Sequence, residues 1–500
     1  MNTIRLHQQA RRADPQAIDK LANWIFVLPH PLPARAISQV PYGDILQARW
    51  KRLDGDKADR KPVILDLPNT TCSHVSFACV RPAISSFELL TLARQLAGAH
   101  EGYGVKELGI LVHGFSARQV ERIAEALIAA VLAAAAEMPK FRSKRRAGAG
   151  LQTIHLYGIR AAHEFRRTFA EVEGNALARS LSMLPANMLT PAAYLKRVRE
   201  LARKNRWKLE FYDVRTLKRY KAGAFLAVAQ GSPTQDAGIV RLHYTPAGAA
   251  GKRRLVLVGK GICYDTGGTN LKTAAYMYGM HEDMQGSAVA LGTLLALTRL
   301  QVKFPVECWM AVAMNHIGPK AYKPNDVITA SDGTTIEVVN TDAEGRMVLA
   351  DTLALASRQK PKLIVDYATL TGACIYSIGK AYSGIFTNRD EWLPVLVDAG
   401  RDSGERVWPF PLDEDYDTLI ESDIADIKQC SREAGADHIL AARFLQRFVK
   451  NNTPWIHIDL ASSNRKGGLA HIPTDTTGFG IRFSLNFLLD KKLVYRDSEK

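Results

Sequence analysis

The chain has 500 residues and a formal net charge of +16, with 47% hydrophobic and 23% charged residues. This composition is typical of a globular protein and excludes a disordered, collagen-like or disulfide-scaffold chain. No apolar run approaches the ~18–20 residues that a membrane-spanning helix needs, so none is expected to span a membrane.

The start of the chain is polar. Residues 1–20 carry both basic and acidic side chains, and no apolar stretch follows the basic ones. This pattern disfavours a secretory signal, and we expect a cytoplasmic protein.

The first third of the chain alternates short apolar runs with longer runs of helical spacing. Such alternation favours an α/β domain with a largely parallel or mixed sheet. Residues 124–136 are Ala-rich and predict a packed helix. Strands are expected at residues 24–28, 63–67, 108–113 and 153–157, and helices at 85–97 and 117–137.

A basic cluster lies between the Ala-rich helix and the strand at 153–157. Its first interpretation is a solvated loop, and the alternative is a surface for anions or nucleic acid. No interleaved aromatic residues or known DNA-binding motif support the alternative. The cluster consists of Lys140, Arg142, Lys144, Arg145 and Arg146.

A change of pattern marks a domain boundary near residue 165. Residues 166–183 predict a helix rich in Arg, Glu and Ala, and Thr190 with Pro191 predicts the N-cap and first turn of the next helix. We therefore predict two α/β domains, residues 1–165 and 166–500. In the second, strands are expected at 208–212, 224–229, 239–244, 254–258, 305–313, 335–339, 363–367 and 455–459, and helices at 286–300, 345–359 and 440–450.

The six cysteines form no CxxC pair. Most of them stand in apolar or small-residue runs, which predicts buried, reduced thiols and disfavours a cysteine zinc site.

Chemistry-bearing residues gather just beyond the ends of three predicted strands, where ligands of α/β sheets usually bind. The first loop is rich in glycine and holds Lys260 and Asp265, with Lys272 shortly after. Neither GxxxxGK[ST] nor GxGxxG is present, so a nucleotide loop is disfavoured. Without a partner elsewhere, this loop would be only a glycine turn with surface charges.

In the second loop, Asp283 precedes a helix start, which a helix cap alone could explain. His281 and Glu282 look like half of a zincin motif, but Gln285 stands where HExxH needs histidine, so that class is excluded.

In the third loop, Asp342, Glu344 and Arg346 follow a strand end. Thr341 and Glu344 fit a capping box, but capping does not explain all three charged residues together.

Together these loops offer four carboxylates, which repel one another unless cations hold them. Two divalent metal ions ~3.5–4 Å apart, bridged by shared carboxylates, would do so. Oxygen-rich ligation suits magnesium, manganese or zinc. A lysine ligand must be neutral, and burial beside two cations can depress its pKa.

At these residues the chain resembles the leucyl aminopeptidase family of dinuclear metallo-aminopeptidases. The segment Asn-Thr-Asp-Ala-Glu-Gly-Arg at 340–346 reproduces that family's signature heptapeptide, and segments 258–268, 365–373, 457–461 and 477–482 match in order and spacing. The resemblance covers roughly residues 165–490. It implies a smaller N-terminal macro-like α/β domain and a larger catalytic domain whose mixed central sheet is flanked by helices.

The resemblance also implies roles for the site residues. One metal ion would be held by Asp265, Asp342 and Glu344, and the other by Lys260, Asp265, Asp283 and Glu344. Zinc or manganese are expected, with magnesium or cobalt as alternatives, and a metal-bridging hydroxide would attack the scissile carbonyl. Lys272 would lie beside that carbonyl, and Arg346 would hold a bicarbonate that serves as general base.

Peptides with a free N-terminus are the expected substrates, and a homohexamer is the expected assembly. Substrate-binding residues would be Met280, Asn340, Thr369, Gly372 and Asn464. The family usually has Gly and apolar residues where Ser462, Ser463 and Asn464 stand, and a small Gly-containing turn where 436–438 stand, so the pocket is expected to be more polar than one built for leucine. An alternative adds a DNA-binding or regulatory role through the basic N-terminal domain.

Overall fold

The structure is a computed structural model that describes residues 4–52, 61–143, 150–249, 251, 253–433 and 435–494. It divides into two compact units, residues 1–172 with 466–475, and residues 173–465 with 476–500. The predicted boundary at 165/166 differs because the helix α7 (Arg166–Ser182) runs across the division without a break. No sequence signal marked the return of residues 466–475 to the first unit.

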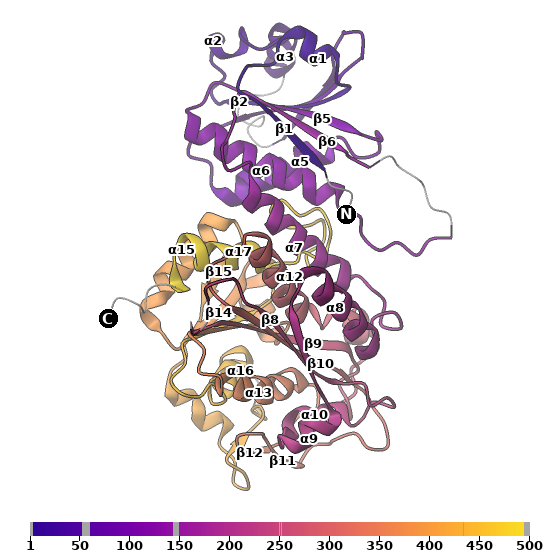
Figure 1. The fold of residues 1–500 in the computed structure, drawn as a ribbon, viewed down its shortest axis with the longest axis vertical. Coiled ribbons are helices and arrows are strands. Elements are labelled where there is room, and N and C mark those ends of the chain that lie inside the picture. The colour runs from indigo at the N-terminus through magenta and orange to yellow at the C-terminus, as the bar shows by residue number, and fades with distance from the viewer. Residues whose placement is uncertain are drawn as a thin grey trace. The chain divides into compact units, whose positions relative to one another are not determined.

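The first unit is a six-stranded sheet with helices on both faces (Figure 1). Its strand order is β1-β6-β5-β2-β4-β3, and all neighbours are parallel except β3 and β4. The elements are β1 (Arg5–Gln9), α1 (Pro15–Asp19), β2 (Asn23–Pro29), α2 (Ala34–Ile37), α3 (Gly43–Lys51), β3 (Val63–Asp66), β4 (His74–Val80), α5 (Ser86–Gly98), β5 (Glu107–Val112), α6 (Ala117–Ala135) and β6 (Thr153–Tyr157).

The two faces of this sheet have separate cores. Helices α5 and α6 bury their apolar residues on one face, and α1, α2 and α3 cover the other. Helix α5 begins at a capping box in which Glu88 N donates to Ser85 Oγ at 3.3 Å. The Ala-rich stretch is buried as predicted, within α6.

Two strands of this unit were not predicted, and both lack the expected pattern. Strand β1 reads Arg-Leu-His-Gln-Gln, so it has little apolar character, and β4 is interrupted by the buried Ser76, whose hydroxyl donates to Leu96 O at 3.1 Å. Of the basic cluster, Lys140 and Arg142 are exposed, while Lys144, Arg145 and Arg146 lie outside the described residues.

The second unit is built on an eight-stranded mixed sheet of order β15-β14-β17-β13-β9-β10-β8-β7. The central strands β17, β13, β9 and β10 are parallel, and antiparallel pairing begins at β8 and β14. Its strands are β7 (Lys208–Asp213), β8 (Gly238–Tyr244), β9 (Leu255–Asp265), β10 (Val306–Asn315), β13 (Leu363–Ala368), β14 (Ser383–Thr387), β15 (Val407–Pro409) and β17 (Trp455–Asp459), with a small sheet of β11 (Val327–Thr329), β12 (Thr335–Glu337) and β16 (Ile427–Lys428).

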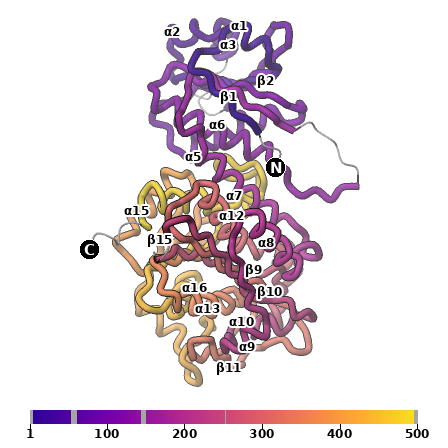
Figure 2. Tube along the Cα trace, viewed as in Figure 1, coloured from indigo at the N-terminus to yellow at the C-terminus, as the bar shows by residue number. Residues whose placement is uncertain are grey.

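Helices cover both faces of this sheet. α12 packs on one face and α13 and α10 on the other (Figure 2). α17 contacts α12 and α15. These helices are α8 (Pro191–Asn205), α9 (Val214–Arg219), α10 (Gly223–Ala229), α11 (Ala274–Met277), α12 (Gln285–Arg299), α13 (Glu344–Ser357), α14 (Gly372–Ile378), α15 (Leu393–Ser403), α16 (Asp437–Gln446) and α17 (Ile481–Leu485). Among the described helices, none is both long and apolar enough to cross a membrane.

One predicted strand is wrong: residues 224–229 form the helix α10. The run is short and apolar, so its periodicity does not separate a strand from a buried helix. A distant side chain decides the outcome, because the buried Asp351 accepts a hydrogen bond from Phe225 N at 2.8 Å at the start of α10. By contrast, the predicted N-cap is confirmed, since Thr190 Oγ1 accepts from Ala193 N at 3.3 Å.

Two glycines let α12 press directly on the strands beneath it. A Cβ on Gly259 of β9 would lie 2.4 Å from Ser287 Cα, and one on Gly286 would lie 2.1 Å from Tyr367 O. These backbone atoms have no flexible end that could move aside. The close approach therefore fixes the start of α12 against β9 and β13.

We expect Gly286→Ala to destabilise the protein by about 1–3 kcal/mol, because the added methyl group forces the helix away from the sheet. Denaturant unfolding of the metal-free protein measures this as a lower midpoint. Gly98→Ala is the matched control, since a Cβ there meets nothing within 4 Å. An unchanged midpoint for Gly286→Ala would contradict the close packing.

Candidate metal centre and active site

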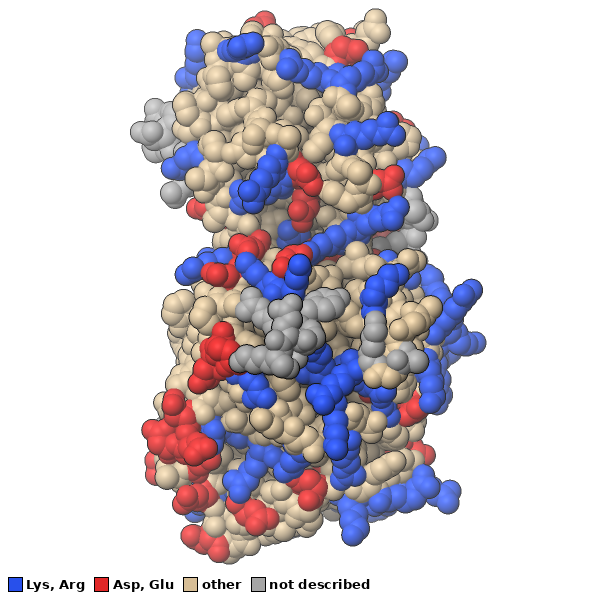
Figure 3. Space-filling model, turned by 60° about the vertical axis from the view of Figure 1, so that its left-hand side comes forward, with Lys and Arg blue, Asp and Glu red and all other residues tan. Residues whose placement is uncertain are grey.

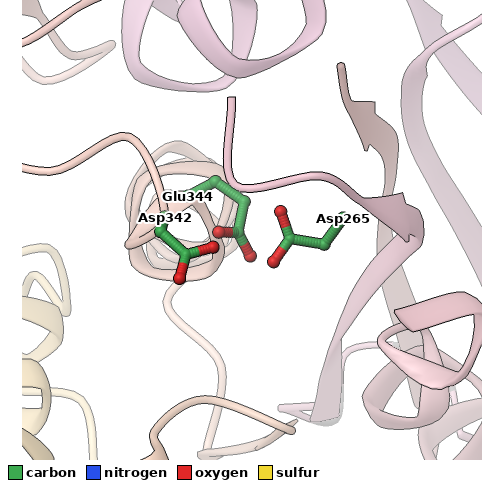
Figure 4. Close-up of side chains that lie close together, drawn as sticks. All are labelled: Asp265, Asp342 and Glu344. Carbon is green, nitrogen blue, oxygen red and sulfur yellow. The ribbon is translucent and has the colours of Figure 1, made fainter. Parts of the chain in front are cut away.

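Three predicted carboxylates meet where the parallel strands of the second unit end. Asp265 is the last residue of β9, and Asp342 and Glu344 stand at the start of α13. One oxygen from each lies within 4.8 Å of the others, and their carboxylates converge (Figure 4). The prediction that these carboxylates cluster is confirmed for these three residues, although Asp342 and Glu344 follow β12 of the small sheet and not a strand of the eight-stranded sheet.

Two lysines pair with these acids: the buried Lys260 connects the group to the fourth carboxylate, Asp283, and Lys272 is half-buried. Lys260 Nζ lies 2.8 Å from Asp283 Oδ1 and 2.9 Å from Glu344 Oε1, and it donates to Thr369 O at 2.9 Å. Lys272 Nζ lies 2.9 Å from Asp265 Oδ2 and 2.6 Å from Asp342 Oδ1. Each lysine thus bridges two acids, and all six side chains form one cluster.

Two buried acids of the cluster have raised pKa values. Burial, with a further contribution from Asp265, raises the pKa of Glu344 to about 8. Burial also raises the pKa of Asp283 to about 6, against the stabilising effect of Lys260. Carboxylates that resist ionisation at close quarters favour a cation among them. Such shifts are typical of functional sites.

For the pKa of Lys260, the neighbouring charges have a larger effect than burial. Burial lowers the pKa of Lys260, but Asp283, Glu344 and Asp265 outweigh it and raise that pKa above its ordinary value. Without metal, therefore, Lys260 is a cation that pairs with the acids. To serve as a ligand it would lose its proton as metal ions enter, and this remains a prediction.

The donor set fits divalent metal ions. Glu344 Oε2 and Asp283 Oδ2 are buried and have no hydrogen-bond partner among the described residues. Buried polar atoms are normally paired, so two unpaired carboxylate oxygens in one cluster indicate a missing partner. Carboxylate oxygens with a lysine nitrogen are hard ligands that suit such an ion.

Neighbouring polar residues hold the ligands in place. Asn315, at the end of β10, donates from Nδ2 to Asp265 Oδ1 at 2.8 Å and to Thr341 O at 3.0 Å. Thr369 Oγ1 donates to Asp283 Oδ1 at 2.7 Å. Sequence reasoning missed Asn315, although a polar residue ending a strand beside β9 was a usable signal.

The predicted capping box at Thr341 is wrong. Its hydroxyl donates to Gly267 O at 2.6 Å and accepts from Asn270 N at 2.8 Å, so it ties the third loop to the first. Helix α13 has no side-chain cap. Glu344 is therefore free to face the cluster instead of closing its own helix.

Arg346 lies in the first turn of α13 and is 2% exposed. Its Nη2 lies 2.7 Å from Asp437 Oδ1, and its Nη1 donates to Gln429 O at 3.1 Å. The other N–H groups of this guanidinium donate to no described residue. A guanidinium of this kind fits a small planar anion.

The predicted substrate-binding residues lie along the same edge. Met280 and Thr369 are half-buried, and Gly372 begins α14, where a Cβ would meet only Tyr376 at 3.7 Å. Asn340 makes a local turn, since its Oδ1 accepts from Asp342 N at 2.9 Å. Asn464 Nδ2 donates to Glu282 Oε2 at 2.6 Å, a contact that the sequence did not indicate.

The comparisons with known proteins agree with this site. A family model described as "Cytosol aminopeptidase family, catalytic domain" matches residues 176–485. The chain belongs to the cytosol aminopeptidase family. The sequence resemblance to leucyl aminopeptidases, and with it the expected class of enzyme, is thereby confirmed at the level of the family.

Curated relatives extend this match. A protein of Wolbachia pipientis wMel called "Probable cytosol aminopeptidase" is 40% identical over 66% of this chain, and the match spans 66% of that relative's own length. A protein of Rhodopseudomonas palustris (strain BisB18) with the same description is 36% identical over 80% of this chain and 81% of the relative.

A solved structure supports the fold over nearly the whole chain. The bottromycin maturation enzyme BotP in complex with Mn superposes with a TM-score of 0.82 at 27% identity, covering 94% of this chain and 99% of that one. The predicted fold class, a smaller macro-like α/β unit followed by a larger unit with a mixed sheet, is confirmed.

Proposed function

We propose that this protein is a metal-dependent aminopeptidase that releases N-terminal residues from peptides at a dinuclear metal site. The single observation that carries the proposal is the cluster of three buried carboxylates, the half-buried Asp342 and Lys260, in which two oxygens lack a partner among the described residues. The cytosol aminopeptidase family supplies the reaction class.

Five residues would hold the metal ions. Asp265, Asp342 and Glu344 would hold one, and Lys260, Asp265, Asp283 and Glu344 the other. When bound, the ions would polarise the scissile carbonyl and make a water acidic enough to attack it near neutral pH. Zinc or manganese are the proposed metals, with magnesium or cobalt as alternatives.

The protein's own groups would position the substrate and stabilise charge. The ammonium of Lys272 lies at the edge of the cluster between Asp265 and Asp342, where it can donate to the developing oxyanion. A free α-amine could bind one of the metal ions in its neutral form, and a blocked N-terminus could not, which would select peptides with a free N-terminus. Arg346 would hold bicarbonate, whose oxygen would accept a proton.

Hydrolysis of aminoacyl-p-nitroanilides tests this proposal. After chelation and removal of metal, we expect activity to fall to background and to return with Zn or Mn, and we expect N-acetyl-leucine p-nitroanilide to resist cleavage. Leu, Met, Ala, Arg and Lys derivatives form the panel, each measured with and without added bicarbonate. Cleavage that survives complete metal removal, or no cleavage of any derivative with either metal, would refute the proposal.

The assembly and location follow the family resemblance. We propose a homohexamer, which sedimentation velocity of the purified protein measures directly, and a cytoplasmic location, which the names of the relatives support. The DNA-binding alternative is not proposed. Basic side chains predominate on the face in Figure 3 but are interspersed with acidic ones, and much of the predicted basic cluster lies outside the described residues.

A further inference from the structure

The carboxylate of Glu282 is held in a defined position beside the candidate site. Glu282 ends the short helix η1 (Met280–Glu282) and directly precedes Asp283. Its Oε2 accepts from Asn464 Nδ2 at 2.6 Å and its Oε1 accepts from Thr476 Oγ1 at 3.0 Å. The backbones of Asn464 and Thr476 pair as an antiparallel bridge, so both donors come from one small, closed structure.

The negative charge of Glu282 has no counter-ion among the residues that the structure describes. Both of its partners are neutral, and no Lys, Arg or His of the described chain lies within ion-pair distance. The carboxylates of Asp283 and Glu344, in contrast, each pair with Lys260. Each carboxylate oxygen can accept more than one hydrogen bond, so Glu282 keeps capacity for a charged donor.

Glu282 belongs to the solvent-accessible part of the predicted substrate pocket. Met280, Glu282, Thr369 and Asn464 are half-buried, whereas the adjoining Asp283, Ser462 and Ser463 are buried. Three of these half-buried residues are the predicted contacts of the substrate's first side chain. The side-chain amide of Asn464 is hydrogen-bonded to Glu282. The group that makes this pocket polar is therefore the carboxylate of Glu282.

We propose that Glu282 determines specificity and selects substrates whose N-terminal residue is basic, arginine before lysine. This inference rests on the proposed aminopeptidase function. An apolar first residue would cover Glu282 without compensating its charge, which is unfavourable. A basic side chain packs its apolar stem along Met280 and brings its charge to Glu282. The fork of a guanidinium can donate to both carboxylate oxygens, while an ammonium meets one as a point charge.

The experiment compares the metal-loaded wild type with Glu282→Gln on Arg, Lys, Leu and Met p-nitroanilides. For the wild type we expect kcat/KM to be highest with Arg. Glu282→Gln is expected to lower kcat/KM for Arg on the order of tenfold, as loss of a charged hydrogen bond does. The Leu and Met values are expected to stay equal or to increase, because an apolar side chain no longer covers an uncompensated charge. Competitive inhibition by free L-arginine should weaken in parallel, and inhibition by L-methionine should not.

Two further variants separate the effect of the Glu282 charge from the effects of its hydrogen bond to Thr476 and of the protein's net charge. Thr476→Val removes one neutral donor but keeps the carboxylate, so the preference for Arg is expected to persist. Glu391→Gln removes a charge from an exposed position in another part of the unit and controls for net charge.

A wild type that cleaves Leu or Met better than Arg, or a Glu282→Gln variant that loses all substrates equally, would overturn the inference and leave the aminopeptidase proposal standing. No cleavage of any derivative by the metal-loaded wild type would overturn both.

Discussion

Replacing Glu344 with glutamine is expected to lower kcat/KM by about 10³-fold or more, because a ligand shared by both proposed metal ions loses its charge while keeping its size. Glu344 is 1% exposed, with Oε1 2.9 Å from Lys260 Nζ and Oε2 unpaired among the described residues. A neutral amide cannot compensate two dications as a carboxylate does. The bound metal content, measured by mass spectrometry after gel filtration, should fall together with activity.

Glu200→Gln serves as the control for this variant, since Glu200 is exposed on α8. It should keep both activity and metal content. The circular dichroism of Glu344→Gln should match that of the wild type, which separates loss of the site from loss of the fold. Full metal content and activity in Glu344→Gln would contradict the proposed ligand set.

Replacing Lys272 with alanine is expected to lower kcat by about 10²–10³-fold with little change in KM, as removal of an oxyanion donor does. The ammonium lies 2.9 Å from Asp265 Oδ2 and 2.6 Å from Asp342 Oδ1. These same oxygens belong to proposed ligands, so Lys272 competes with incoming metal for them. Metal affinity should therefore stay equal or increase when Lys272 is removed, opposite to the effect of Glu344→Gln.

Single-turnover kinetics and metal titration together distinguish these roles. Lys320→Ala is the matched control, because Lys320 is an exposed lysine of the same unit. A Lys272→Ala variant that loses metal in proportion to activity would show that the lysine supports the ligands and takes no part in charge stabilisation.

The sequence predicted the elements that present the site, because their patterns are local. The apolar runs of β9, β10 and β13 are bounded by polar or glycine residues, α11 and η1 lie between β9 and α12, and β12 precedes α13. The candidate ligands stand at those boundaries. Only Asp265 ends a parallel strand of the eight-stranded sheet, where ligands usually bind. The second loop follows η1 and the third follows β12 of the small sheet, so local pattern alone did not place them beside β9.

What the sequence did not predict depends on distant contacts. The helical state of α10 rests on Asp351, and the orientation of Thr341 rests on Asn270 and Gly267. Asn464 was expected as a pocket residue, but its bond to Glu282 spans 182 positions. Local pattern carries no information about such pairs, because either partner alone fits several environments.

The long sequence separations within the metal centre bear on how the protein acquires its metal. Lys260 of β9 donates to Thr369, 109 positions further along the chain, and Asp265 meets Glu344 only after β10 and the start of α13 are in place. A refolding chain that has formed β9 but has not yet joined β13 to it presents isolated oxygens, which hold a divalent ion weakly. High metal affinity therefore arises only when the whole sheet has assembled. Metal uptake thus reports the fraction of molecules that have completed folding, independently of how much helix has formed.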